Sequence, residues 1–415
     1  MTPPDPPSPA TAPADALPPG RRRLITLVLI GLVAFGPLTT DLYLPSLPTL
    51  VRVFETDVAT VQLTLSVYML AFALAQLVHG SLSDRFGRRP VILAGVGLYI
   101  LASLVCAFAP TIELLIAARF LQALGACVGP VIGRAVVRDL WGADRSARVL
   151  ALLSAAVAIA PTVAPSIGGV LEQLFGWRAS FLFLAAFGVT LLAASWAMLA
   201  ESNRHRDPTA LHPLRMIANY RQLLGDRRYL AFVIAASAAY GGIFAFISGS
   251  SHVMVGTLGL SPFWYGIAFG CPVLGYIAGT STTSRLVARV PIPMLIRWGG
   301  LLGATGAGAM TALAWAGALN VAAIILPVGI YLFSAGLIMP SAMAGAIGPY
   351  PRMAGLASAL LGCTTFAFAA LLGIAVGLAH DGTALPMALT QLVMSTTIFA
   401  VSFILARPPA PRPPA

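Results

Sequence analysis

Long, uninterrupted apolar runs recur along this chain of 415 residues, and short segments rich in Arg, Gly and Pro separate them. Each run has about 18 residues or more, which is enough for a helix to cross the hydrocarbon core of a bilayer. A membrane β-barrel would instead show segments of about 10 residues in which apolar and polar positions alternate. The pattern therefore predicts an all-α integral membrane protein.

The runs predict twelve transmembrane helices in two groups of six. The first group is expected at residues 24–47, 58–80, 90–109, 112–135, 147–171 and 178–199. The second group is expected at 229–250, 262–284, 294–316, 320–343, 354–378 and 384–406. The expected domains are an N-terminal six-helix half at 24–199, a cytoplasmic linker at 200–228, a C-terminal six-helix half at 229–406, and disordered cytoplasmic tails at 1–23 and 407–415.

The charge distribution predicts how the chain is oriented. Only 9% of the residues are charged, against about a quarter in a typical soluble domain. With the N-terminus in the cytoplasm, all 25 basic residues fall in cytoplasmic segments except Arg52 and Arg178, which lie outside, and Arg119, which lies within a helix. An excess of arginine on one side is the usual mark of cytoplasmic loops. The net charge of +11 is thus explained by membrane topology, and we expect a multi-pass protein of the inner membrane with both termini cytoplasmic and no nucleic-acid partner.

The segment between the second and third predicted helices carries an ordered pattern of glycines and charges, Gly80-Ser81-Leu82-Ser83-Asp84-Arg85-Phe86-Gly87-Arg88-Arg89. It resembles the loop signature of the major facilitator superfamily. In this pattern Gly80 would allow close helix approach and Gly87 suits a tight turn. Asp84 among the arginines can form charge-assisted bonds in one transporter state and lose them in another. We expect a role in conformational gating for Gly80, Asp84, Arg85, Gly87, Arg88 and Arg89.

The fifth predicted helix contains Ala160-Pro161-Thr162-Val163-Ala164-Pro165-Ser166-Ile167-Gly168-Gly169. This run resembles a signature of the exporters in the same superfamily, with Ala164 in place of the usual glycine. Two prolines and two glycines give a thin, kinkable helix face that can pack tightly and seal one end of a cavity. The gating set therefore includes Pro161, Pro165, Gly168 and Gly169. The alternative is a kinked packing helix without directional meaning.

Two further segments narrow the resemblance. Arg119-Phe120-Leu121-Gln122-Ala123-Leu124-Gly125 is similar to a motif of proton-coupled members, and Thr40-Asp41-Leu42-Tyr43-Leu44-Pro45-Ser46-Leu47-Pro48 resembles a segment of the bicyclomycin-resistance (Bcr/CflA) group of drug:proton antiporters. The resemblance runs from about Leu24 to Arg407. It implies a proton-coupled antiporter that exports small drug-like or antibiotic molecules by alternating access. A proton-coupled transporter of a metabolite such as an amino acid remains the alternative.

Asp41 and Arg119 are the charged residues that the predicted helices place within the membrane. Burial disfavours the charged form of a carboxyl group, so proton uptake and release become possible near neutral pH. Both residues lie about 7 residues from the outer ends of their helices, or ~10 Å deep at ~1.5 Å per residue, so a salt bridge is possible. We expect Asp41 to carry the proton and Arg119 to tune it. The alternatives are that Asp41 faces periplasmic water and that Arg119 extends to the outer surface.

Aromatic and polar residues within the helices are the candidates for substrate contacts, since mostly apolar pockets with a few polar groups suit lipophilic ligands. They are Tyr43, Tyr68, Gln122, Tyr240, Phe244, Phe246, Tyr331 and Phe366. The sequence contains no phosphate-binding G-x-x-x-x-G-K-[ST] loop, which argues against direct ATP drive. We expect no cofactor, no metal and no enzymatic activity. The expected partners are a drug-like substrate, protons and membrane lipid, and the expected state is a monomer.

Overall fold

The computed structural model describes residues 17–203, 206–208 and 220–406, and all regular structure in these residues is helical. The first part of the chain contains α1 (Pro19–Asp41), η2 (Leu44–Ser46), α2 (Leu47–Val53), α3 (Val58–Phe86), α4 (Arg88–Ala107), α5 (Ile112–Ala126), α6 (Val128–Phe175) and α7 (Arg178–Met198). The second part contains α9 (Arg227–Ser251), η3 (His252–Thr257), α10 (Pro262–Leu286), α11 (Ile292–Trp315), α12 (Val321–Ile347), η4 (Pro351–Met353), α13 (Ala354–Leu378) and α14 (Leu385–Leu405).

Ten of the described helical segments are long and apolar enough to cross a bilayer. Long α6 contributes to two of them, because the segments divide at Ile112–Trp141 and Arg145–Phe175. Two further helices, α10 and α11, have 25 and 24 residues, and their many Gly, Ser and Thr residues lower their hydropathy. The described residues therefore contain twelve spans, and the predicted fold class is confirmed.

The predicted helix ends differ from the observed ones most clearly at α1 and at α6, which runs without a break from Val128 to Phe175 although separate helices were predicted at 112–135 and 147–171. α1 begins at Pro19, so Arg21–Arg23 belong to this helix and not to the tail predicted at 1–23. α1 ends at Asp41, and the chain continues through η2 and α2 to Val53, whereas one helix was predicted at 24–47. Two prolines, Pro45 and Pro48, cause this break because proline cannot donate a backbone hydrogen bond. The predicted tails at 1–16 and 407–415 and most of the linker, at 204–205 and 209–219, lie outside the described residues.

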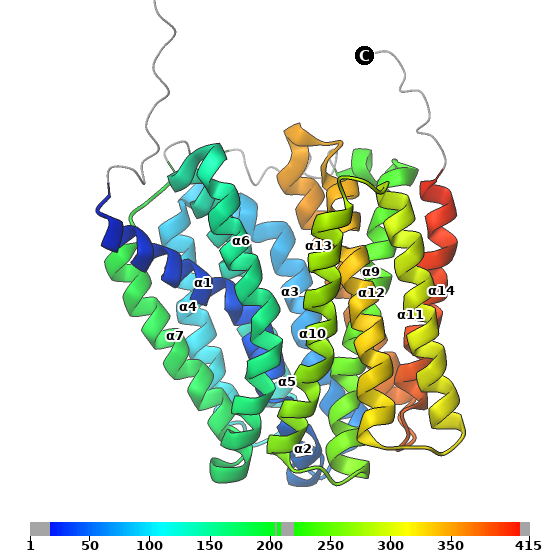
Figure 1. Cartoon of the computed structure of the whole chain (residues 1–415). Coiled ribbons are helices and arrows are strands. Elements are labelled where there is room, and N and C mark those ends of the chain that lie inside the picture. The colour runs from blue at the N-terminus through cyan, green and yellow to red at the C-terminus, as the bar shows by residue number, and fades with distance from the viewer. Residues whose placement is uncertain (1–16, 204–205, 209–219, 407–415) are drawn as a thin grey trace, which may run out of the picture.

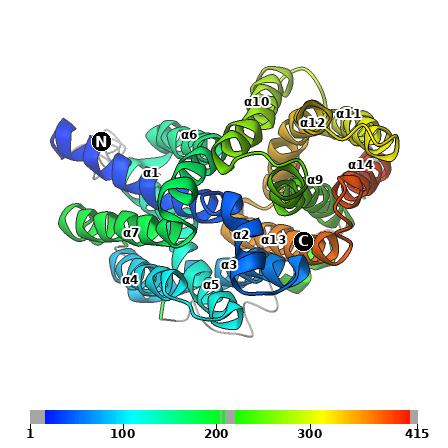
Figure 2. The same ribbon diagram turned by 90° about the horizontal axis from the view of Figure 1, so that it is seen from below.

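The two groups of spans lie side by side, α1–α7 in one half and α9–α14 in the other (Figure 2). α1 begins and α14 ends at the same end of the bundle (Figure 1), which we call the terminal face. The other end, where α2 lies, is called the opposite face. Two helix pairs carry most of the contact between the halves, α3 with α13 and α6 with α10.

The α3–α13 contact is built from polar side chains seated on glycines. Each pair is so close that a Cβ on the glycine would meet the polar side chain, and the pairs are Gln62 with Gly377, Ser66 with Gly373, and Gln76 with Gly362. Because these glycines of α13 carry no side chain, the two helices can approach closely, as is common between membrane helices.

Candidate functional site

Arg119 lies on α5 with its side chain completely buried, at 0% exposure. Its Nε donates a hydrogen bond to the Thr64 carbonyl oxygen at 3.3 Å, and Nη1 donates to the Thr39 carbonyl oxygen at 3.3 Å. Nη1 also donates to Oε1 of Gln122 at 2.6 Å. Nη2 has no hydrogen-bond partner among the described residues. This burial rules out the alternative in which Arg119 extends to the outer surface.

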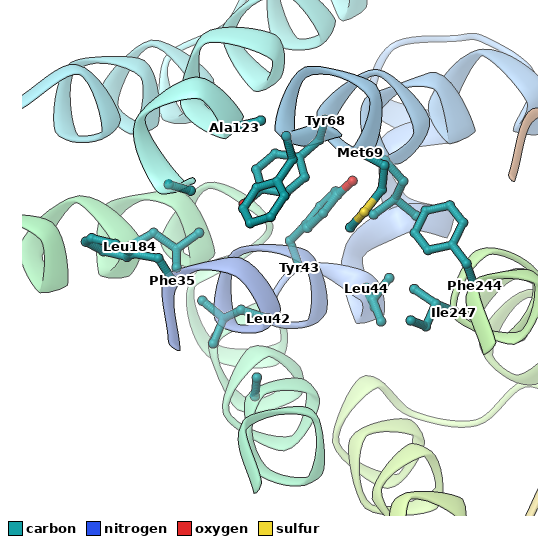
Figure 3. Packing of buried hydrophobic residues seen from close by; sticks show 14 of the residues in the cluster. Phe35, Leu42, Tyr43, Leu44, Tyr68, Met69, Ala123, Leu184, Phe244 and Ile247 are labelled. Atoms are coloured by element: carbon teal, nitrogen blue, oxygen red, sulfur yellow. The ribbon is translucent and has the colours of Figure 1, made fainter. Parts of the chain in front are cut away.

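Aromatic rings complete the surroundings of Arg119. The guanidinium carbon lies 4.5 Å from the ring centre of Tyr43, 4.2 Å from that of Tyr68 and 6.0 Å from that of Phe181. Figure 3 shows Tyr43 and Tyr68 side by side in this region. A buried cation without a carboxylate partner is costly, and ring faces offset part of this cost, about 2 kcal/mol or more at a desolvated site. We call Arg119, Tyr43, Tyr68 and Gln122 the arginine cage.

Asp41 is the last residue of α1 and is 2% exposed. Among the acidic side chains that the structure describes, it alone is buried. Its Oδ1 accepts a hydrogen bond of 2.9 Å from the Thr40 hydroxyl group. The carboxyl group also lies within electrostatic range of Tyr240 on α9 and Tyr265 on α10. Asp41 is therefore placed where the two halves meet, and it does not face water at a helix end.

The salt bridge between Asp41 and Arg119 that the sequence allowed is not formed among the described contacts of this conformer. The donors of Arg119 are directed to oxygen atoms of Thr39, Thr64 and Gln122, while Asp41 is held by Thr40. Counting residues from helix ends gives the depth of a side chain but not the side of the helix on which it lies. The side chains of the two residues form hydrogen bonds with different neighbours.

A row of aromatic side chains crosses from one half to the other. Tyr68 and Phe72 of α3 stack with ring centres 6.1 Å apart, Phe72 meets Phe366 of α13 at 5.2 Å, and Phe366 meets Tyr240 of α9 at 5.0 Å. We call these four residues the aromatic row. Three of them were predicted as substrate contacts, while Phe72 was missed because nothing in the sequence separates it from a lipid-facing ring.

The other predicted contacts in the second half are packing residues in this conformer. Tyr331 is buried and its hydroxyl group donates to the carbonyl oxygen of Ala239 at 3.3 Å. Phe246 stacks on Phe269 of α10, with ring centres 5.0 Å apart. Phe244 is buried against Ser66 and Gly373 where the halves meet, and Figure 3 shows it opposite Met69. These contacts hold α9 against its neighbours.

The proline- and glycine-containing stretch of α6 packs near the opposite face against the end of α1 in its own half and against α10 in the other half. A Cβ on Gly168 would overlap the carbonyl oxygen of Leu42, the residue after Asp41. A Cβ on Gly169 would overlap the carbonyl oxygen of Pro262 at the start of α10. A Cβ on Gly266 of α10 would overlap the carbonyl oxygen of Pro165. We call this contact the opposite-face seal. Nearer the terminal face, Ala151, Leu152, Ser154 and Ala155 of the same helix are exposed.

The charged loop between α3 and α4 is organised around Arg88. Its side chain pairs with Asp84 at 2.5 Å and with Asp139 of α6 at 3.1 Å. Glu201, just after α7, accepts hydrogen bonds from the backbone N–H groups of Arg88 and Arg89 at 2.9 and 3.3 Å. A carboxylate at this helix N-terminus is favoured by the helix dipole.

Two glycines of this loop behave differently from one another. Gly87 has a φ of +102°, and a Cβ there would overlap the Glu201 carboxylate. The tight turn expected at Gly87 is therefore present. At Gly80, by contrast, a Cβ would meet no atom within 4 Å, so the expected close helix approach at this glycine is wrong for this conformer. The sequence also missed Asp139 and Glu201, although each is a lone carboxylate next to an arginine-rich segment.

The fold and these sites define a helical membrane transporter built from two six-helix groups, rather than an enzyme. The family model described as Major Facilitator Superfamily matches residues 20–374, and the chain belongs to this superfamily. It is 32% identical over 341 residues to multidrug resistance protein D of Escherichia coli, which covers 81% of this chain and 84% of that protein. It is 29% identical over 394 residues to the bicyclomycin resistance protein homolog of Haemophilus influenzae, with 92% and 96% covered.

Solved structures share the fold at low sequence identity. A POT family transporter in complex with a thioalcohol-conjugated peptide superposes with a TM-score of 0.74 at 12% identity, over 95% of this chain and 97% of that one. The likeness supports the arrangement of the helices alone.

Proposed function

We propose that this chain is a proton-coupled antiporter that exports small drug-like or antibiotic molecules across the bacterial inner membrane. The observation that carries the proposal is Asp41, a buried carboxyl group without an ion-pair partner among the described residues, located where the halves meet. An ionisable residue inside a membrane protein is a functional site by default. The relatives named for multidrug and bicyclomycin resistance support drug-like molecules as the exported cargo.

The proposed cycle couples Asp41 to the opposite-face seal. Leu42 lies directly on Gly168, so a shift of α6 against α1 moves the residue next to the carboxyl group. In the state shown, Asp41 has no cation beside it and holds a proton. When a drug binds in this state, α1 turns so that Asp41 reaches the unpaired Nη2 of Arg119, and the proton leaves towards the terminal face. When the seal then opens, the pair separates and Asp41 takes up a proton from the opposite face, so protons move in the direction opposite to the drug.

The terminal face is proposed to be cytoplasmic, with both termini on that side, because the arginines gather there. The linker at 200–228 would then join the two halves in the cytoplasm. We propose that this conformer faces inward, because the glycine contacts of α6 hold the halves together at the opposite face. In the proposed working form one chain, as a monomer, contains the complete transport path.

The substrate is proposed to bind along the aromatic row, with the arginine cage at its edge. Rings from α3, α13 and α9 offer flat apolar surfaces on both halves. A lipophilic aromatic molecule would contact both halves at once, and its binding would depend on their relative position. Tyr240 and Phe366 are half-buried, so a small side-chain rotation admits a ligand.

A drug-susceptibility panel in an efflux-deficient host tests the proposal. Expression of the chain should raise resistance to several lipophilic compounds, and the increase should disappear when the proton gradient is collapsed. Asp41→Asn, expressed to the same level, serves as the matched control. A flat resistance profile together with proton-driven uptake of a metabolite such as an amino acid would contradict drug export.

A further inference from the structure

A groove on the outer surface of the second half lies between α10 and α11. Both helices pack along α12, which lies between them in the view along the bundle (Figure 2). The groove has a volume of about 430 Å³, and its lining is apolar: Thr282, Leu286, Trp298, Leu301, Leu302, Phe333 and Leu337. The hydroxyl group of Thr282 donates to the Ala278 carbonyl oxygen at 2.8 Å, so it adds no unpaired polar group.

The depth of the groove fits one leaflet of a bilayer. α11 begins at Ile292 on the terminal face, and its lining residues run from Trp298 to Leu302. At ~1.5 Å per residue these residues lie about 9 to 15 Å below the start of the helix. Half of the hydrocarbon core is about 15 Å thick. The groove thus occupies the depth of the acyl chains in the leaflet at the terminal face.

Two arginines lie where α10 ends and α11 begins, and we call this terminal-face end of the groove its mouth. Arg285 precedes the lining residue Leu286 on α10, and Arg289 follows in the turn before α11. Both side chains are exposed, and neither has a hydrogen-bond or ion-pair partner among the described residues. In the sequence, Asp381 is the only acidic residue between 227 and 406, and it belongs to the α13–α14 connection at the opposite face. The positive charge of these two arginines therefore has no carboxylate partner within α9–α14.

We propose that this groove binds an anionic diacyl phospholipid, with one acyl chain along α10 and α11 and the phosphate group on Arg285 and Arg289. The apolar lining would contact the acyl chain, and the unpaired guanidinium groups would bind the negative headgroup. Trp298, 37% exposed, is one of the residues that line the groove. This site is separate from the aromatic row and Asp41, and it does not depend on what the protein transports.

Quenching of Trp298 fluorescence by brominated lipids tests the proposal. The full chain is reconstituted in phosphatidylcholine bilayers, and either brominated phosphatidylglycerol or brominated phosphatidylcholine is added in increasing mole fraction. The signal that disappears in Trp298→Phe is the signal of this groove. Brominated phosphatidylglycerol should saturate it at a mole fraction roughly tenfold lower than brominated phosphatidylcholine, as expected for two arginines near a membrane surface.

Two pairs of substitutions distinguish lipid binding in the groove from a general effect of positive charge on the protein. Arg285→Gln with Arg289→Gln should abolish the preference for phosphatidylglycerol, while Arg52→Gln with Arg178→Gln should leave it unchanged. Native mass spectrometry of the purified protein should show one retained phosphatidylglycerol fewer in the first pair of substitutions. Equal quenching by the two lipids, or a preference that survives loss of both Arg285 and Arg289, would overturn the proposal.

Discussion

The guanidinium carbon of Arg119 lies 4.2 Å from the ring centre of Tyr68, and the cation is held by ring faces and neutral oxygen atoms instead of a carboxylate. The cage leaves Nη2 unpaired among the described residues, while Asp41 lies at the junction of the halves without a cation beside it. We propose that the two groups pair with one another in a different conformer.

Tyr68→Leu should destabilise the protein, because the buried cation loses a ring face worth on the order of 1–2 kcal/mol. Tyr68→Phe is the matched control, since it keeps the ring and removes a hydroxyl group that has no hydrogen-bond partner among the described residues. Thermal unfolding in detergent measures both variants. Equal loss of stability in the two would show that the ring face does not support Arg119.

Gly168→Ala should impair transport, because a Cβ at this position overlaps the Leu42 carbonyl oxygen and forces α6 away from α1. Gly168→Leu should abolish transport. The control is Gly97→Ala on α4, where a Cβ meets nothing within 4 Å and should stabilise the helix by up to about 1 kcal/mol. Export assays at matched expression compare the variants, and full activity of Gly168→Leu would contradict a sealing role.

Asp84→Asn should slow transport while drug binding at equilibrium stays near the level of the unchanged protein. The substitution weakens the 2.5 Å ion pair with Arg88, and the loop lies at the terminal face, far from the aromatic row. Arg85→Gln, in the same loop but exposed, should have a smaller effect. Transport rates are measured across a membrane, and binding affinities are measured in detergent. Lost binding in a folded Asp84→Asn protein would refute a purely conformational role.

Reporter fusions test the proposed orientation. A fusion after Ala415 should report the cytoplasm, and a fusion in the loop near Asp381 should report the periplasm, because the distribution of arginines places the terminal face inside. A report of the same side from both positions would contradict the twelve-span topology.

The apolar runs were sufficient to predict the spans, because each needs its own stretch of apolar residues to cross the membrane. The break after Asp41 was missed, although Pro45 and Pro48 were visible, because the apolar run continues through them. The side of a helix on which a given side chain lies was harder to predict. The sequence placed Asp41 and Arg119 at one depth, but which neighbour each side chain meets depends on helix rotation, which is set by packing between helices.

The same limit explains the mixed outcome for the aromatic candidates. Tyr68 and Phe366 lie in the aromatic row, while Phe246 and Tyr331 pack helices together. A ring in an apolar run has the same sequence signal whether it meets lipid, another helix or a ligand. Among the charged residues, Asp84 gave a clear signal and pairs with Arg88, whereas the partners Asp139 and Glu201 were missed.

Drug-induced proton release from the purified protein near neutral pH tests the central claim, that Asp41 carries the transported proton. Addition of a transported compound to the unchanged protein in weakly buffered detergent should release protons, detected with a soluble pH indicator dye. Asp41→Asn should release none while still binding neutral compounds, and Glu113→Gln, an exposed residue on α5, should release as much as the unchanged protein. Undiminished release from a folded Asp41→Asn protein would contradict the account.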